Sequence, residues 1–279
     1  MTTRRVLPPS LSLVLLLGSF AGSACKKDED VTTDPETATT DTTEPADEGP
    51  TYPPQDPDPA EIAQALERYI LGHYEEAANL VRPLSENLLE DSQIRARGLA
   101  SAVLAMAVAH ELAENGKAPA QIAQEQADRL ADPELTQMAG LAKVSYLVGL
   151  QDYAEAETIL DEVGKLETPY AHLVTLFRAE ATLGQAFEDD KLKYPEKLDA
   201  AAAHYQSVWD NAAMPGYKGR AAEGLTAVGY YKKDKDQTCQ WSNQALDTYE
   251  AAGASDYMLE GPRGPADAMR CERKKDGGE

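Results

Sequence analysis

The sequence has few of the residues that enzymes and metal proteins use for chemistry. It contains 3 cysteines and 4 histidines among 279 residues. None of the histidines has a second histidine or cysteine at the spacing of metal ligands. Phosphate-binding loops, dinucleotide-binding fingerprints and nucleophile elbows are also absent. We therefore predict no catalytic set, no metal and no cofactor, and we expect a protein that is not an enzyme.

Basic residues are scarce as well. There are 26 lysines and arginines against 48 acidic residues, which gives a net charge of −22 at pH 7. Nucleic acids and anionic lipid headgroups repel a chain of this charge, so neither is an expected partner. Aromatic residues make up 6% of the chain and most of them are tyrosine, which weakens the case for a sugar-binding protein.

The sequence has no apolar run long enough for a typical membrane span. Ser10–Ala24, "SLSLVLLLGSFAGSA", is uncharged and largely apolar. Its length of about 15 residues is short of the roughly 20 that a bilayer requires. Arg4 and Arg5 precede it, so residues 1–24 are predicted to be a signal peptide. A membrane anchor helix is the alternative, and "TRRVL" loosely resembles a twin-arginine signal.

The apolar run ends in "GSAC", residues 22–25. Small residues followed directly by a cysteine resemble the lipobox of bacterial lipoproteins, although Gly22 stands where that family favours leucine. The resemblance implies that Cys25 is the first mature residue and carries acyl chains. It also implies a lipid-anchored protein of the cell envelope. Lys26, rather than an aspartate, follows the cysteine, which implies the outer membrane.

Residues 25–58 have almost nothing to bury. Lys26–Asp58 is rich in Thr, Asp, Glu and Pro, and its 11 acidic residues against Lys26 and Lys27 give a net charge of −9. Such a segment cannot offset the entropy of ordering its backbone, so we predict a disordered tether. The alternative is a low-complexity leader without a role.

The remainder of the chain has helical periodicity and no alternating strand pattern. Asp-Pro and Thr-Pro pairs are typical of helix starts, with a capping side chain followed by proline. We predict an all-α domain over residues 59–253 made of five antiparallel helix pairs. The expected helices are 59–72 with 74–89, 92–114 with 118–130, 133–149 with 152–166, 169–187 with 195–211, and 216–231 with 235–252.

Two of these pairs resemble tetratricopeptide repeats. Gly72, Tyr74 and Ala77 match the family's turn glycine, packing tyrosine and small residue, and Tyr153 with Ala156 matches the last two again. The resemblance implies a right-handed superhelix, or solenoid. An irregular helical bundle is the alternative, because the two matching tyrosines are not separated by a multiple of the roughly 34-residue repeat.

The resemblance also implies that the first helix of each pair lines a concave groove. Arginine and tyrosine are favoured at interfaces. The arginines and tyrosines that fall on these helices are therefore candidate groove residues, namely Arg95, Arg97, Tyr170, Arg178, Tyr217 and Arg220.

Two functions are compatible with these features. The first is a lipid-anchored scaffold or assembly factor that binds envelope proteins through its helical surface. The alternative is a lipoprotein that captures a small molecule, a sugar or a peptide.

The two cysteines other than Cys25 are predicted to form a disulfide. Cys239 lies in the first turns of the tenth helix, and Cys271 lies in a tail, residues 254–279, beyond two Gly-Pro pairs. An oxidising envelope favours the bond. The tail would then cap the end of the array and bury Met258, Leu259 and Met269. Two unpaired buried thiols are the alternative.

The lipidation hypothesis predicts the behaviour of a Cys25→Ala variant. Without the acyl chains the protein should move from the membrane fraction to the soluble fraction, or its signal peptide should remain uncleaved. Fractionation of cells followed by immunoblotting measures this. An unchanged membrane fraction would contradict the lipoprotein interpretation.

Overall fold

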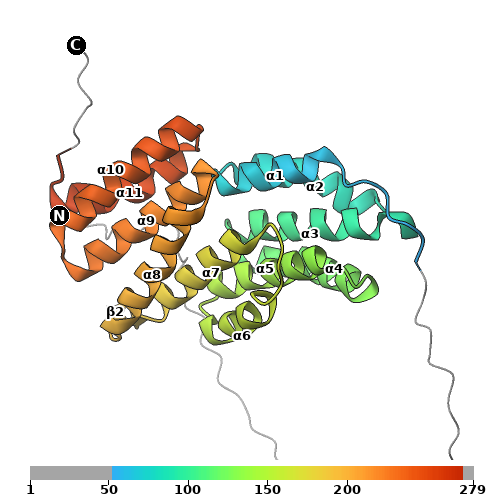
Figure 1. Cartoon of the computed structure of the whole chain (residues 1–279), viewed down its shortest axis with the longest axis horizontal. Coiled ribbons are helices and arrows are strands. Elements are labelled where there is room, and N and C mark those ends of the chain that lie inside the picture. Colours follow the sequence, from blue (N-terminus) through green and yellow to red (C-terminus); the bar gives the residue numbers. More distant parts are fainter. Residues whose placement is uncertain (1–51, 273–279) are drawn as a thin grey trace, which may run out of the picture.

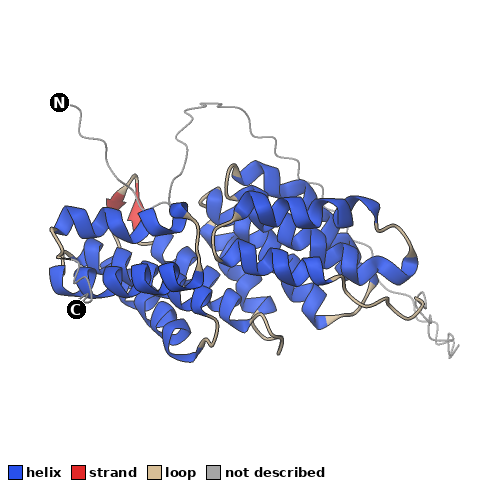
Figure 2. Ribbon diagram, turned by 90° about the horizontal axis from the view of Figure 1, so that it is seen from above, coloured by secondary structure: helices blue, strands red, loops and turns tan. Residues whose placement is uncertain are grey.

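The computed structural model describes residues 52–272. This part of the chain is almost wholly helical (Figure 2). A hairpin of two short antiparallel strands, β1 (Phe187–Glu188) and β2 (Lys191–Leu192), is the only sheet in it. The helices are α1 (Ala60–Ile70), α2 (Tyr74–Asn87), α3 (Ile94–Ala109), α4 (Lys117–Arg129), α5 (Pro133–Gly149), α6 (Tyr153–Val163), α7 (Ala171–Gly184), α8 (Pro195–Asn211), α9 (Pro215–Lys232), α10 (Lys235–Ala252) and α11 (Asp256–Met269), with 3₁₀ turns at Asp91–Gln93 and Ala113–Gly116.

The ten helices expected from the sequence are all present, and the prediction of an all-α domain is confirmed. Side chains cap several of them. Asp132, Asp152 and Asp234 each accept a hydrogen bond from a backbone N–H in the first turn of α5, α6 and α10. Proline occupies the first turn of α5, α8 and α9, where its missing N–H has no helical partner to lose.

Consecutive helices pack against each other, and the odd-numbered helices also contact one another in a row (Figure 1). The row runs from α1 through α3, α5 and α7 to α9. Alanine and glycine are frequent in α3 and α9 and allow neighbouring helices to approach them closely. In α3, 13 of 16 residues are buried, which places this helix at the centre of the core.

Tyrosine rings from the even-numbered helices fill the space left by glycines on α9. A Cβ atom on Gly224 would lie 2.3 Å from Cζ of Tyr205, and one on Gly219 would lie 2.4 Å from Cε1 of Tyr249. Only glycine leaves room for a ring at these two positions. The buried tyrosines thereby fix the distance of α8 and α10 from α9.

The row of helices returns to its own beginning. Helix α9 contacts α1, and the backbone N–H of Ser255 donates to the carbonyl of Leu71, 3.0 Å away. Met258 of α11 packs against Gly72, whose positive φ of 79° forms the turn between α1 and α2. Figure 1 shows the blue α1 meeting the orange α9. The first and last helices therefore close the array instead of leaving two free ends.

The tail forms a continuous helix, whereas Gly-Pro pairs in a sequence favour a helix break. Helix α11 continues through both Gly261-Pro262 and Gly264-Pro265. Packing explains the difference, because Pro262 and Pro265 are buried and the hydroxyl of Ser242 donates to the carbonyl of Pro262. These contacts with α9 and α10 offset the backbone hydrogen bonds that the prolines remove.

The tail covers α9 and α10, as the cap hypothesis requires. Met258 and Leu259 are buried against Leu246 and Tyr249, whereas Met269 is only half-buried.

No helix within residues 52–272 is long and apolar enough to cross a bilayer. The predicted signal peptide, the predicted lipidation site Cys25 and the predicted tether up to residue 51 lie outside the described residues.

The last part of the expected tether belongs to the folded body. The boundary predicted at Pro59 is therefore several residues too late. The backbone N–H of Asp56 donates to the carbonyl of Ser92, and the side chain of Gln55 accepts a hydrogen bond from the backbone of Arg95. The Arg129 guanidinium lies 5.1 Å from the centre of the Tyr52 ring. Such polar contacts do not produce a hydrophobic pattern in the sequence, so the sequence does not indicate that this segment is folded.

The expected disulfide joins Cys239 of α10 to Cys271 just after α11, with their Cα atoms 5.2 Å apart. The bond spans a sequence separation of 32 residues. Its loss should lower the free energy of unfolding by about 3–4 kcal/mol on the chain-entropy model. Urea denaturation of Cys239→Ser/Cys271→Ser, with and without a reductant, measures this. Reduction should destabilise the parent protein and leave the double variant unchanged; equal curves for all four samples would contradict the prediction.

Candidate functional site

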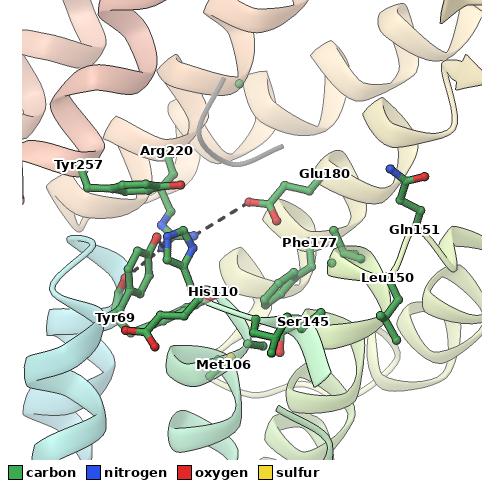
Figure 3. Close-up of a pocket in the computed structure, with 18 of the residues that line it drawn as sticks. Tyr69, Met106, His110, Ser145, Leu150, Gln151, Phe177, Glu180, Arg220 and Tyr257 are labelled. Atoms are coloured by element: carbon green, nitrogen blue, oxygen red, sulfur yellow. Dashed lines mark hydrogen bonds and ion pairs between the residues drawn. The ribbon is translucent and has the colours of Figure 1, made fainter. Parts of the chain in front are cut away.

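A pocket of about 360 Å³ lies where the odd-numbered helices converge. Each helix of the row contributes to its wall: Tyr69 from α1, Met106 from α3, Ser145 from α5, Phe177 from α7 and Arg220 from α9 (Figure 3). The even-numbered helices and α11 add tyrosines to it, namely Tyr74, Tyr153, Tyr205 and Tyr257.

Arg220 is the cation of this pocket, and its side chain is only 10% exposed. Nε donates to the carbonyl of Ile70 and Nη2 to the carbonyl of Tyr69, each at 3.0 Å. Nη2 also donates to the hydroxyl of Tyr74 at 3.1 Å, and the guanidinium lies 4.8 Å from the centre of the Tyr69 ring. The residue thus connects α9 to the last turn of α1, where helix carbonyls lack partners and favour a positive charge.

Two carboxylates share the pocket with Arg220. The Glu180 side chain points across the pocket toward it, with Oε1 4.0 Å from Nη1 (Figure 3). Glu223 lies one turn after Arg220 on α9, is 8% exposed, and accepts a hydrogen bond of 2.7 Å from the Tyr249 hydroxyl. Burial raises the pKa of Glu180, and it raises the pKa of Glu223 to about 7.

His110 forms part of the wall without a charge at neutral pH. Its ring stacks on Tyr74 with 3.7 Å between the ring centroids and meets the Tyr257 ring edge-on at 4.6 Å. Burial and the nearby Arg220 lower the pKa of His110 to about 4. It has no metal partners, since residues 52–272 contain no group of three or more metal-binding side chains.

The mouth of the pocket combines acidic and apolar residues. Leu112 and Leu150 line it while remaining 48% and 39% exposed. Glu111 and Glu114 also line the pocket and are exposed, and Glu114 pairs with Lys117 at 2.7 Å. Counting the interior and the mouth, four carboxyl groups line the pocket and Arg220 is the one cation among its lining residues.

Of the six candidate groove residues, Arg220 lines this pocket and the other five do not. The remaining arginines connect helices elsewhere. Arg95 forms ion pairs with Asp58, Asp132 and Glu134. Arg97 donates to the carbonyl of Ser85.

Arg178 donates to the Leu160 carbonyl at 2.8 Å and pairs with Asp161 at 2.6 Å. Tyr170 is half-buried at the start of α7, and burial raises its pKa. Tyr217 is buried at the start of α9 beside His172, with 5.9 Å between the ring centroids. These side chains take part in contacts between helices, and of the six candidates only Arg220 lines the pocket.

The sequence did not lead us to predict a site that combines Glu180, Glu223, His110 and the tyrosines of the pocket. One signal was available: Glu180 and Glu223 each stand among small and apolar residues, in "FRAEATLG" and "AAEGLTAVG". A carboxylate in a helix that must be buried on most sides needs a specific reason to be there.

No protein family, curated protein or solved structure matches this chain. The function is therefore inferred from the pocket itself.

Replacing Arg220 by methionine should lower the free energy of unfolding by about 3–5 kcal/mol, because the carbonyls of α1 lose their donor and Glu180 loses its counter-charge. Arg178→Met is the matched control. It removes an arginine that also bonds a helix carbonyl and one carboxylate, but its side chain is 29% exposed. Its loss should be about 1 kcal/mol or less. Urea denaturation of both variants measures the difference, and equal losses would show that the Arg220 contacts do not hold the array closed.

Proposed function

We propose that this protein is a lipid-anchored binding protein of the cell envelope that captures a small ligand in its central pocket. The body is proposed to be a tetratricopeptide-like superhelix that has closed on itself. Consecutive pairing, together with contacts between successive odd-numbered helices, supports this description of the fold.

The convergence of all five odd-numbered helices on one pocket carries the proposal. In a tetratricopeptide-like array these helices form the inner surface. Here the contact of α9 and α11 with the first helix pair turns that surface into the wall of a pocket. The polar groups of the wall come from segments far apart in the sequence, as is typical of a binding site.

The dimensions of the pocket favour capture of a small molecule or a short peptide over a scaffold role. A volume of about 360 Å³ falls within the range of roughly 300–1,000 Å³ found for small-molecule sites. A scaffold would instead present a long open groove on the inner helices. An envelope protein could then bind only to the outer helices, and no specific observation favours binding there.

The location of the protein completes the proposal. Acylation of Cys25 would hold the protein at a membrane, and the acidic segment before Tyr52 would separate the folded body from the membrane surface. A disulfide between Cys239 and Cys271 fits an oxidising compartment such as the envelope.

A thermal-shift screen with sugars, short peptides and small organic molecules tests capture. A ligand at 100 times its Kd should stabilise the native protein by about 2.7 kcal/mol and raise the Tm by several degrees. Ser145→Trp should abolish the shift, because Ser145 lines the pocket and the indole would fill it.

Ser207→Trp is the matched control, since Ser207 is exposed on α8 away from the pocket. It should leave the shift unchanged. A screen without any stabilising compound, or an undiminished shift in Ser145→Trp, would contradict capture in this pocket.

A further inference from the structure

The charges of the pocket define the ligand further, provided that the pocket is a capture site as proposed above. Arg220 is its one lining cation, and two of its three nitrogens are directed to Ile70, Tyr69 and Tyr74. Only Nη1 faces Glu180, at 4.0 Å, which is longer than a hydrogen bond. Arg220 therefore holds the helices together and compensates the carboxylates of the pocket only in part.

The two interior carboxylates can accept hydrogen bonds from a ligand. An ionised carboxylate accepts about four. Glu223, which is 8% exposed, accepts one from Tyr249, and Glu180 faces Arg220 at 4.0 Å. A ligand with several N–H donors and a positive charge would add hydrogen bonds and a counter-charge to both groups.

An anionic ligand does not fit this wall. It would meet Glu180 and Glu223 inside and Glu111 and Glu114 at the mouth, with a single guanidinium nitrogen to receive it. The field of the whole chain, with its net charge of −22, also attracts cations and repels anions.

Apolar groups on the wall indicate the rest of the ligand. Phe177 and Tyr205 line the interior beside the carboxylates, and aromatic rings favour cations as neighbours. At the mouth, Leu112 and Leu150 are exposed large apolar side chains on the pocket lining. An apolar chain attached to the cationic group would cover them.

We propose that the pocket binds a small organic amine, whose ammonium group faces Glu180 and Glu223 and whose apolar chain lies against Leu112 and Leu150. The ammonium donates its three N–H groups to the carboxylate oxygens. The amine is a free small molecule, because a pocket of about 360 Å³ is of the size found for small-molecule sites.

Binding should strengthen as the pH rises from 6 to 8. Glu223 has a pKa of about 7, raised chiefly by burial and also by the charge of Glu180, so its carboxylate is mostly protonated at pH 6 and mostly ionised at pH 8. An alkylamine keeps its charge over this range, since lysine has a pKa of about 10.4. If only the ionised form binds, the affinity rises by about tenfold.

Apart from Glu180, the titratable groups near Glu223 do not change charge between pH 6 and 8. Arg220 stays positive, His110 stays neutral with its pKa of about 4, and the tyrosines stay neutral because burial raises their pKa. Burial raises the pKa of Glu180 on α7, in the same direction as the pKa of Glu223. The tyrosines concerned are Tyr74, Tyr205, Tyr249 and Tyr257.

Calorimetric titration of the full mature chain with hexylamine, hexan-1-ol and hexanoate tests the proposal. The three probes share one apolar chain and differ in the charge of the head group. At pH 8 hexylamine should bind with an affinity at least tenfold above the other two, and its affinity should fall by about tenfold at pH 6. Equal affinity for hexylamine and hexan-1-ol would overturn the assignment of an amine.

Glu180→Gln and Glu223→Gln locate the site. Each substitution should lower the affinity for hexylamine by tenfold or more. Glu223→Gln should also remove most of the pH dependence of binding. Its amide oxygen can still accept the hydrogen bond from the Tyr249 hydroxyl. Glu86→Gln, on an exposed position of α2 outside the pocket, should change nothing. Unchanged binding in both pocket variants would place the amine elsewhere and overturn the proposal.

The two proposals fail in different ways. If hexylamine does not bind but another compound from the screen binds and Ser145→Trp blocks it, the amine assignment is wrong and capture stands. If neither hexylamine nor any screened compound binds, capture itself is wrong.

Discussion

The contact between Arg220 and the end of α1 is the constraint on which the architecture depends. A row of helix pairs that curves in one direction has two free ends unless something holds them together. The guanidinium does this by donating to two carbonyls in the last turn of α1 and lying against the Tyr69 ring. Arginine suits the position because its planar group offers several donors at fixed angles and keeps its charge when buried.

Closure also explains the composition of the inner helices. Five helices converge on a small pocket only if their side chains are short where they approach one another, and α3 and α9 are accordingly rich in alanine and glycine. Such helices leave gaps, which tyrosines from the even-numbered helices fill. Tyr205 and Tyr249 pack on glycines of α9, and Tyr249 carries its hydroxyl to Glu223. The scarcity of aromatic residues in the sequence therefore understates their role.

The helices could be predicted from the sequence, because the start of a helix depends on capping residues and prolines that are close together in the chain. Asp132 followed by Pro133 marks the start of α5 wherever that helix packs. The disulfide followed from the count of cysteines. The pocket did not, since its polar residues come from α7 and α9 and meet only when the array closes. Closure depends largely on hydrogen bonds to backbone carbonyls, from Arg220 to Ile70 and Tyr69 and from Ser255 to Leu71, and backbone partners leave no trace in a sequence.

Helix α11 connects the pocket to the oxidation state of the protein. Near its beginning, Tyr257 meets the His110 ring in the pocket wall and Met258 packs on the turn between α1 and α2. Just after its end, the disulfide attaches Cys271 to α10. Two buried prolines reduce the helix's own hydrogen bonding, so its position relies on these attachments at both ends. A reduced chain would therefore hold one wall of the pocket less firmly than an oxidised one.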